Sequence, residues 1–229
     1  MINKEKYLAL IVARKGSKGI KNKNMIKIRS KHLIEWTFIE AKKSKLIDKI
    51  VLSTDCKNII DLAKKYKILI PFIRPNYLSK DNTSIIKVVI HAINWVEKNL
   101  HEKYDNIVLL QPTSPLRTVK HIDQAINYFS KNKKNNRVKL ISAFKINQKY
   151  NWLMSTNNRI YCNFISKLLN TKNLRRQEFK ELILPNGAIF ISSVNNISSG
   201  FYNNLTLYYL MKKSDSVDID TFDDVKKIK

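Results

Sequence analysis

The sequence predicts an α/β fold in which helices cover both faces of a mostly parallel sheet. Segments with the apolar pattern of a strand alternate along the 229 residues with segments that carry apolar residues at helical spacing. Such alternation is typical of βα units, whose crossover connections make neighbouring strands parallel. The short, continuous apolar run Ile107–Leu110 is expected where helices bury both faces of a sheet.

In the first half of the chain, each strand pattern precedes a helical one. The strands expected here are Leu8–Ala13, Lys49–Ser53 and Ile68–Ile73. The helices expected between and after them cover residues 33–41, 59–63 and 84–99. The last of these helices has the clearest pattern, because its apolar residues fall on one side: Ile85, Val88, Val89, Ala92 and Val96.

The second half continues the pattern after an interruption. The strands expected here are Ile107–Leu110, Val138–Phe144, Ala188–Ser192, Thr206–Leu210 and Ser216–Ile219. Helices are expected over residues 122–129 and 222–228. The pattern weakens over about 147–184, so we expect this segment to leave the sheet as a lid or a dimerisation excursion from a single domain over 1–229.

The chain is strongly basic, with 43 Lys and Arg against 18 Asp and Glu and a formal net charge of +25. Such a field attracts polyanions, so a basic nucleic-acid-binding protein is one hypothesis. However, the cations are spread along the whole chain, mostly as Lys beside Asn and Ile. We therefore interpret the charge as the compositional background of an AT-rich genome, with some benefit to the binding of anionic substrates.

Cysteine usage and hydropathy indicate a soluble, cytoplasmic protein. Cys56 and Cys162 form neither a disulfide framework nor a metal-ligand pattern, which fits a reducing compartment. The apolar run Tyr7–Ala13 is short and lacks a cleavage site, so we interpret it as a buried strand rather than a signal peptide. No stretch approaches the ~18 apolar residues that a membrane-spanning helix needs.

The most informative segment is the glycine-rich, basic loop that begins at Arg14, after the first strand. Glycines allow several backbone N–H groups to converge on one anion, and Arg and Lys add full charges around it. The loop matches neither of the two standard phosphate-binding fingerprints. It predicts a triphosphate site at the end of the first strand, and the alternative is a solvated basic turn.

Two carboxylates near the end of the chain predict a metal site. Asp218 and Asp220 are two residues apart, so in a strand they share a face while Val217 and Ile219 pack behind them. Mg²⁺ prefers a few carboxylate oxygens together with water and substrate phosphates. The alternative is a polar edge strand whose acids face solvent or nearby lysines.

Further polar residues follow the expected strands, where open parallel sheets bind ligands. Pro112 and Pro115 stiffen the chain after Ile107–Leu110, which holds Gln111 and Thr113 at the sheet edge. A rigid connection with Thr118 as a helix N-cap explains the same residues equally well.

Three other segments have simple structural explanations. Asp55 is expected to cap a helix, and residues 81–84 likewise precede a strong helix. Arg74, at the end of a strand, could reach a nucleotide base or phosphate. Asn186–Gly187 predicts a tight turn into a buried strand. The four histidines show no metal-ligand spacing and receive no catalytic role.

Taken together, these segments resemble the acylneuraminate cytidylyltransferases, or CMP-sialic acid synthetases. The matching segments are Ala13–Ile20, Lys23–Asn24, Ser53–Asp55, Arg74–Pro75, Leu110–Arg117, Asn186–Ile189 and Asp218–Thr221. The resemblance implies a Rossmann-like fold of the nucleotide-diphospho-sugar transferase type and a homodimer. It also implies transfer of CMP from CTP to the anomeric hydroxyl of a nonulosonic acid, N-acetylneuraminate or legionaminate foremost, with release of pyrophosphate. A cytidylyltransferase for 3-deoxy-manno-octulosonic acid is the related alternative.

The resemblance also assigns roles around the nucleotide. Arg14 would hold the triphosphate together with the loop residues Gly16, Ser17, Lys18 and Gly19. Lys23 would neutralise charge on the α-phosphoryl group, and Asn24 would contact the nucleotide. The cytosine and ribose would lie near Arg74, Asp81, Thr83 and Ser84.

Metal and sugar residues follow from the same resemblance. Asp218 and Asp220 would carry Mg²⁺, for which Mn²⁺ could substitute, and would complete the catalytic set with Arg14 and Lys23. The residues expected at the sugar are Gln111, Thr113, Asn186, Phe190, Arg176 and Gln177. Arg176–Gln177 would reach across a dimer interface to the partner's sugar. Phe190 stands where relatives often have tyrosine.

Overall fold

A six-stranded sheet forms the centre of the computed structural model, which describes residues 5–16, 19–156, 162–165, 179 and 181–228. The strand order is β10-β6-β9-β5-β1-β4. Their bounds are β1 Tyr7–Ala13, β4 Lys49–Thr54, β5 Asn106–Leu110, β6 Lys139–Ile146, β9 Leu182–Ser193 and β10 Thr206–Leu210. β1 is parallel to β4 and β5, and β6 is parallel to β10, whereas β9 is antiparallel to both of its neighbours. The predicted mostly parallel sheet is confirmed, with one reversed strand.

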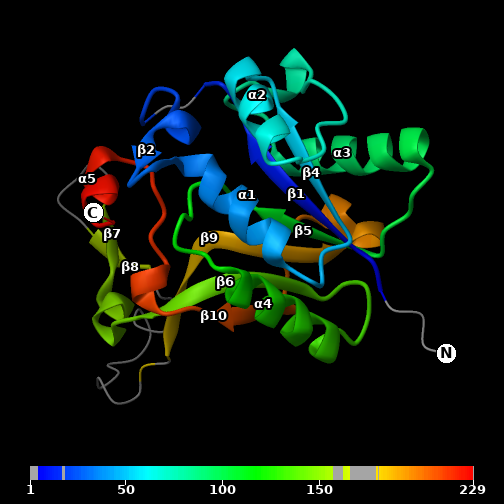
Figure 1. Cartoon of the computed structure of the whole chain (residues 1–229). Helices are drawn as coiled ribbons and strands as arrows, with labels where there is room; N and C mark the ends of the chain where they lie inside the picture. The colour runs from blue at the N-terminus through cyan, green and yellow to red at the C-terminus, as the bar shows by residue number, and fades with distance from the viewer. Residues whose placement is uncertain (1–4, 17–18, 157–161, 166–178, 180, 229) are drawn as a thin grey trace.

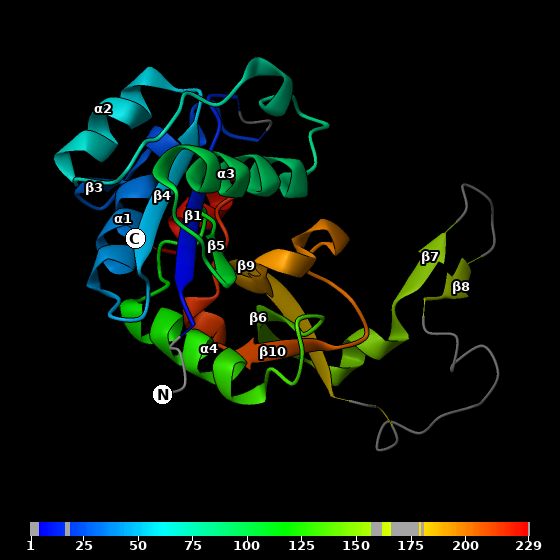
Figure 2. The same ribbon diagram turned by 90° about the vertical axis from the view of Figure 1, so that its right-hand side faces the viewer.

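Helices cover both faces of this sheet (Figures 1 and 2). On one face, apolar residues of α1 (Leu33–Lys43), α2 (Lys57–Lys65) and α4 (Val119–Asn132) pack with those of the strands in one core cluster. On the other face, α3 (Ile85–Leu100) and the 3₁₀ segment η5 (Val194–Ser199) contribute to a second cluster. Central strands buried on both faces explain why Ile107–Leu110 is apolar throughout.

Two of the expected strands are wrong. Residues 68–73 make only single bridges to β4, through Leu69 and Ile73. Pro71 interrupts this segment, and because proline lacks an N–H group it cannot continue a ladder of hydrogen bonds. Residues 216–219 form no strand; the N–H group of Ile219 donates instead to the carbonyl of Thr113, in the loop after β5.

The expected turn at Asn186–Gly187 is also wrong. Both residues lie inside β9, which begins at Leu182 rather than at Ala188. The pairing of β9 with β6 shifts register between Ile141 and Ala143, and Gly187 has φ +71° at this irregularity. The left-handed conformation that glycine favours therefore produces a bulge in a continuous strand instead of a chain reversal.

A segment after β1 and the last residues of the described chain meet beside the sheet. A third apolar cluster joins Ile20, Ile28 and Leu33 to Ile219 and Ile228. The cluster includes residues of β2 (Lys27–Ile28), with which the short strand β3 (Lys31–His32) pairs, and of the start of α1. The C-terminal helix α5 (Phe222–Lys226) packs against the cluster. This packing places the acidic segment 218–220 against the glycine-rich loop after β1.

Residues 147–181, which we call the arm, lie between β6 and β9 in the sequence. The described part of the arm includes the 3₁₀ helix η3 (Gln148–Trp152) and the hairpin of β7 (Met154–Thr156) and β8 (Cys162–Phe164). Figure 2 shows this hairpin standing away from the main body. The Trp152 ring meets the edge of the Phe179 ring, with centroids 4.9 Å apart.

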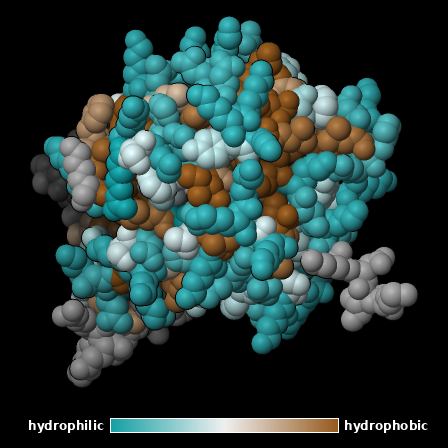
Figure 3. Space-filling view, viewed as in Figure 1, coloured by the Kyte–Doolittle hydropathy of each residue, from teal (hydrophilic) through white to brown (hydrophobic). Residues whose placement is uncertain are grey.

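The face of the molecule shown in Figure 3 is largely hydrophilic. In the face shown in Figure 3, hydrophilic residues surround narrow apolar bands. Among the helices that the structure describes, none is both long and apolar enough to span a bilayer.

Arg117 fastens three elements from inside the core. Its guanidinium donates hydrogen bonds to the carbonyl oxygens of Gln111 (2.8 Å) and Ala188 (2.8 Å) and to the Thr37 hydroxyl (2.6 Å). The side chain is buried, and this burial lowers the pKa of the guanidinium to about 9. Arg117 thereby holds the end of β5, the middle of β9 and α1 in one arrangement.

We expect Arg117→Met to lower the free energy of unfolding by about 2–4 kcal/mol, because three buried acceptors lose their donor. Urea unfolding followed by circular dichroism measures the change. Lys120→Met, at an exposed position of α4, is the control and should change stability by less than about 0.5 kcal/mol. Equal losses in the two variants would contradict this account of Arg117.

Candidate active site

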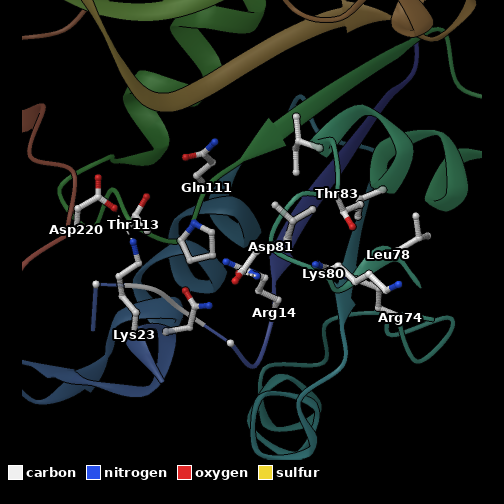
Figure 4. Close-up of a pocket in the computed structure, with 17 residues that line it drawn as sticks. Arg14, Lys23, Arg74, Leu78, Lys80, Asp81, Thr83, Gln111, Thr113 and Asp220 are labelled. Carbon is white, nitrogen blue, oxygen red and sulfur yellow. Dashed lines mark hydrogen bonds and ion pairs between the residues drawn. The ribbon is translucent and has the colours of Figure 1, made fainter. Parts of the chain in front are cut away.

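A cavity of about 370 Å³ opens at the carboxyl ends of β1 and β5 (Figure 4). Residues from both ends of the chain line it. Its charged and polar side chains are Arg14, Lys23, Asn24, Arg74, Lys80, Asp81, Thr83, Gln111, Thr113 and Asp220. The structure thus brings together most residues that the sequence placed around a nucleotide.

The glycine-rich loop forms one wall of this cavity. Gly16 and Gly19 both line it, but only Gly19 is sterically required, because a Cβ atom there would collide with the backbone carbonyl of Asp220. A Cβ atom on Gly16 would meet nothing within 4 Å. Gly19 therefore lets the first loop approach the C-terminal acidic segment.

The two loop cations each form an ion pair across the cavity. Arg14 pairs with Asp81, from the segment before α3. Lys23 Nζ lies 2.7 Å from Asp220 Oδ1. Figure 4 shows both pairs facing the same space from different elements. Two of the four cations in the described lining are therefore paired with a carboxylate, whereas neither carboxylate is paired with Arg74 or Lys80, so the cavity has a net positive charge.

Asp55 fastens the loop instead of capping a helix. Its Oδ1 accepts a hydrogen bond from the backbone N–H of Lys15 at 2.7 Å. α2 begins after Cys56, and its N-cap has no side-chain hydrogen bond. The expected capping role of Asp55 is therefore wrong, because the neighbouring loop offers its carboxylate an unpaired N–H group.

Arg74 forms a rigid part of the wall. Its Nε donates to the Ser53 hydroxyl at 3.0 Å, and a second guanidinium nitrogen donates to the Ser53 carbonyl. Burial lowers the pKa of Arg74 to about 10, a shift that the charge of Asp55 opposes and that of Arg14 reinforces. The guanidinium is thus held in place and remains a cation at neutral pH.

Asp218 and Asp220 have different surroundings. Asp220 is exposed on the cavity wall, whereas Asp218 turns inward and is not part of that wall. Burial raises the pKa of Asp218; a hydrogen bond from Thr113 opposes the shift, and the charge of Asp220 adds to it. Asp218 Oδ1 is buried and has no hydrogen-bond partner among the described residues.

Gly187 has no side chain and thereby leaves space for the side chains of Gln111 and Asp218. A Cβ atom at this bulge would lie 3.2 Å from Gln111 Oε1 and 3.4 Å from Asp218 Oδ2. The bulge in β9 therefore sets the positions of both side chains.

A second, mainly apolar cavity of about 400 Å³ adjoins the first and shares Gln111 and Ile85 with it. Its remaining lining residues are Ile86, Leu109, Phe190, Ser199, Gly200, Phe201 and Tyr202. The Phe190 ring centroid lies 5.3 Å from that of Phe201 and 6.2 Å from that of Tyr202. Sequence reasoning missed Phe201 and Tyr202, although two adjacent aromatic residues within a polar stretch were a usable signal.

Comparison with known proteins identifies the family of the chain. The profile of the cytidylyltransferase family matches residues 8–227. The chain belongs to this cytidylyltransferase family. It is 31% identical to a CMP-N,N'-diacetyllegionaminic acid synthase of Legionella pneumophila, over 94% of the chain and 91% of that protein.

Two further comparisons show how far the family relationship extends. An N-acylneuraminate cytidylyltransferase of Escherichia coli is 30% identical over 94% of the chain, but the chain spans only about half (49%) of that relative. Among solved structures, a CMP:2-keto-3-deoxy-manno-octonic acid synthetase in complex with CTP superposes with a TM-score of 0.71 at 13% identity, covering 97% of this chain and 96% of that one. This last likeness shows a shared fold.

In this cytidylyltransferase-family chain, some predicted site residues lie away from the two cavities. Ser84 caps α3 by accepting a hydrogen bond from the Ile86 N–H group at 3.3 Å. The Asn186 amide is buried, accepting from the Ser142 hydroxyl (2.5 Å) and donating to that of Ser216 (2.9 Å). The predictions for Ser17, Lys18, Arg176 and Gln177 fall outside the described residues.

The two loop glycines provide a matched pair of variants. We expect Gly19→Ala to lower the free energy of unfolding by about 1–3 kcal/mol, because the new Cβ must displace the Asp220 backbone. Gly16→Ala should change it by less than about 0.5 kcal/mol. Chemical denaturation of both variants measures the difference, and a Gly19→Ala protein as stable as Gly16→Ala would contradict the close approach.

Proposed function

We propose that this chain transfers CMP from CTP to the anomeric hydroxyl of a nonulosonic acid and releases pyrophosphate. One observation carries the proposal: Arg14, Lys23 and Asp220, from opposite ends of the chain, line one cavity that adjoins an apolar cavity through Gln111. A charged site for a triphosphate thus lies next to a site for an acylated sugar. The names of the N-acylneuraminate and legionaminic acid relatives support the same reaction.

The chemistry requires positioning and charge neutralisation rather than a protein nucleophile. Arg14 and the loop N–H groups would hold the triphosphate and the departing pyrophosphate, and Lys23 would neutralise charge at the α-phosphoryl group. Within the described lining of the first cavity there is no Cys or His, so nothing there suggests a covalent intermediate.

The opposite side of the first cavity suits the nucleoside. Arg74 is fixed by Ser53, so it would meet a cytosine or ribose oxygen with little loss of side-chain entropy. Asn24 and Thr83 line the same space and offer uncharged donors and acceptors. Together these residues would position the nucleotide.

Asp218 and Asp220 fit a divalent cation. The buried, unpartnered Asp218 Oδ1 is a group that a cation would satisfy, and carboxylate oxygens are the ligands that Mg²⁺ prefers. In the described part of the chain no three acidic, His or Cys side chains converge on one point, so phosphate oxygens and water would complete the coordination. Bound Mg²⁺, or Mn²⁺ in its place, would neutralise phosphate charge and lower the pKa of the attacking hydroxyl.

The second cavity would receive the sugar. Gln111 could hydrogen-bond to it from the shared wall, while Phe190, Phe201 and Tyr202 would contact apolar groups. Because the wall is mainly apolar, it favours an N-acylated sugar such as N-acetylneuraminate or legionaminate over 3-deoxy-manno-octulosonic acid, which has no acyl group. The likeness to the synthetase for the latter type of acid concerns the fold.

The arm would form a homodimer. Its described part exposes the apolar side chains of Leu153 and Ile165, with 49% and 63% of their surface accessible. A second copy of the chain would cover such side chains, and Arg176–Gln177 belong to the same arm. We place the dimer in the cytoplasm, where the buried thiol of Cys56 stays reduced.

A panel of sugar acids tests the proposed reaction. The purified chain is mixed with CTP, Mg²⁺ and either N-acetylneuraminic, legionaminic, pseudaminic or 3-deoxy-manno-octulosonic acid, and released pyrophosphate is measured. We expect release only when CTP, metal and a nonulosonic acid are all present. Release with none of the nine-carbon acids, or release that is fastest with 3-deoxy-manno-octulosonic acid, would overturn the proposal.

Asp220→Ala should lower the turnover number about 100-fold or more while the fold stays intact, because the cavity loses its exposed metal ligand. Pyrophosphate release gives the rate, and circular dichroism checks the fold. Asp223→Ala is the control, since Asp223 is exposed on α5 and does not line the cavity. Undiminished turnover in Asp220→Ala would refute the metal role.

Phe190→Leu should raise the KM for the sugar about threefold to tenfold and leave the KM for CTP within about twofold, because an aromatic wall of the second cavity is lost. Initial rates at varied sugar and varied CTP separate the two constants. The control Phe222→Leu alters a phenylalanine that is 65% exposed and lines neither cavity. An equal rise in both KM values would argue against a sugar site at Phe190.

A further inference from the structure

Asp81 binds the guanidinium group of Arg14, which a triphosphate in the first cavity would need as a hydrogen-bond donor. The Asp81 carboxylate forms an ion pair with Arg14. The Arg14 side chain is 28% exposed and that of Asp81 is 55% exposed, so the pair lies at the mouth of the cavity. Figure 4 shows the two side chains meeting inside the group of lining residues.

The segment around Asp81 is built to present this carboxylate. The Thr83 N–H group donates to the Lys80 carbonyl at 3.1 Å, which closes a turn with Asp81 inside it. The Thr83 hydroxyl donates to the Tyr77 carbonyl at 3.2 Å, and the turn leads into the capped start of α3. These hydrogen bonds hold the backbone of Asp81 in a position from which its carboxylate reaches Arg14.

The other acid near this loop behaves differently. Asp55 accepts a hydrogen bond from the Lys15 backbone, so it supports the loop and does not occupy the Arg14 side chain. Asp81 instead holds a side chain whose planar donors suit phosphate oxygens. It would oppose a polyanion in two ways, by occupying these donors and by repelling the like charge.

We propose that Asp81 competes with phosphates for Arg14 and thereby sets how tightly the cavity binds polyanions, an inference that rests on the proposed nucleotide site. The competition weakens the binding of every polyanion. CTP recovers affinity through contacts of its base and ribose, for example at Arg74, whereas pyrophosphate and inorganic polyphosphates have no such contacts. Because this loss of affinity is similar for all phosphates, its effect is a threshold: a simple polyphosphate, which has no other contacts, no longer fills the cavity at concentrations at which CTP still binds, and pyrophosphate is released more readily.

The charge of the chain makes this discrimination useful. A net charge of +25 draws polyanions of all kinds toward the surface. A cavity lined only by Arg, Lys and backbone N–H groups would bind many of them. Because a polyanion must first displace the Asp81 carboxylate from Arg14, a higher concentration of that polyanion is needed to fill the cavity.

Isothermal titration calorimetry with sodium tripolyphosphate in EDTA tests the proposal without metal or turnover. We expect Asp81→Asn to bind tripolyphosphate about threefold to tenfold more tightly than the unmodified chain at 50 mM KCl, with a smaller gain at 300 mM KCl. Asp81→Glu keeps the charge and should bind within about twofold of the unmodified chain. Asp61→Asn is the charge-matched control, because Asp61 is exposed on α2 and does not line the cavity; it should also stay within about twofold.

A titration with cytidine separates competition from a structural role. Because cytidine has no phosphate to compete for Arg14, Asp81→Asn should not bind it more tightly by the threefold or more that is expected for tripolyphosphate. Unchanged or weaker tripolyphosphate binding by Asp81→Asn, or an equal gain in Asp61→Asn, would overturn the proposal. Asp81→Ser serves as a second neutral variant if Asp81→Asn unfolds at a lower temperature.

The proposed nucleotide site fails in a distinguishable way. If the unmodified chain binds CTP neither with Mg²⁺ nor in EDTA, the cavity is not a nucleotide site. If CTP binds and Asp81→Asn shows no gain for tripolyphosphate, only the role of Asp81 is lost.

Discussion

The contact between the glycine-rich loop and the C-terminal acidic segment is the constraint on which the site depends. Gly19 lies against the backbone of Asp220, and the apolar cluster around Ile20 and Ile219 holds the two segments together. Hydrophobic burial here brings charges from opposite ends of the chain into one cavity. The Lys23–Asp220 ion pair, which joins residues 197 positions apart, exists because this apolar packing puts them side by side.

The rest of the site follows from the ends of the strands. β1 leads into the loop that carries Arg14, and β5 leads to Gln111, whose carbonyl accepts a hydrogen bond from the buried Arg117. The reversed strand β9 then adds Gly187 from the opposite direction. Its bulge leaves room for Gln111 and Asp218, so the antiparallel strand, which interrupts a parallel sheet, shapes the junction of the two cavities.

The sequence predicted the fold where local pattern and tertiary structure agree. Thr206–Leu210 has the predicted bounds, and the helices on both faces were anticipated from apolar spacing. The sequence pattern gave a wrong prediction where one local preference is compatible with two structures. Asn–Gly favours a left-handed glycine, but that conformation serves a bulge as well as a turn, and only the pairing with β6 decides between them.

The candidate site was predictable to the extent that its residues follow strands. Arg14 and Gln111 gather as expected, because the parallel strands β1 and β5 direct their ends to one edge; Asp220 joins them although no strand directly precedes it, through the packing of Ile219 against Ile20. The partners of these residues were not predictable, since Asp55 could be a helix cap or a loop anchor until the loop was placed beside it. Phe201 and Tyr202 follow no strand and reach the second cavity only through the path of the chain after η5.

The length of β9 separates the arm from the aromatic wall of the second cavity. One strand carries the attachment of the arm at Leu182 and the aromatic wall at Phe190, roughly 25 Å apart at the usual rise per residue. The pairing of Phe190 with Leu109 on β5 fixes the wall independently of the arm. Changes at the arm end of this strand can therefore leave the position of the aromatic wall at Phe190 unchanged.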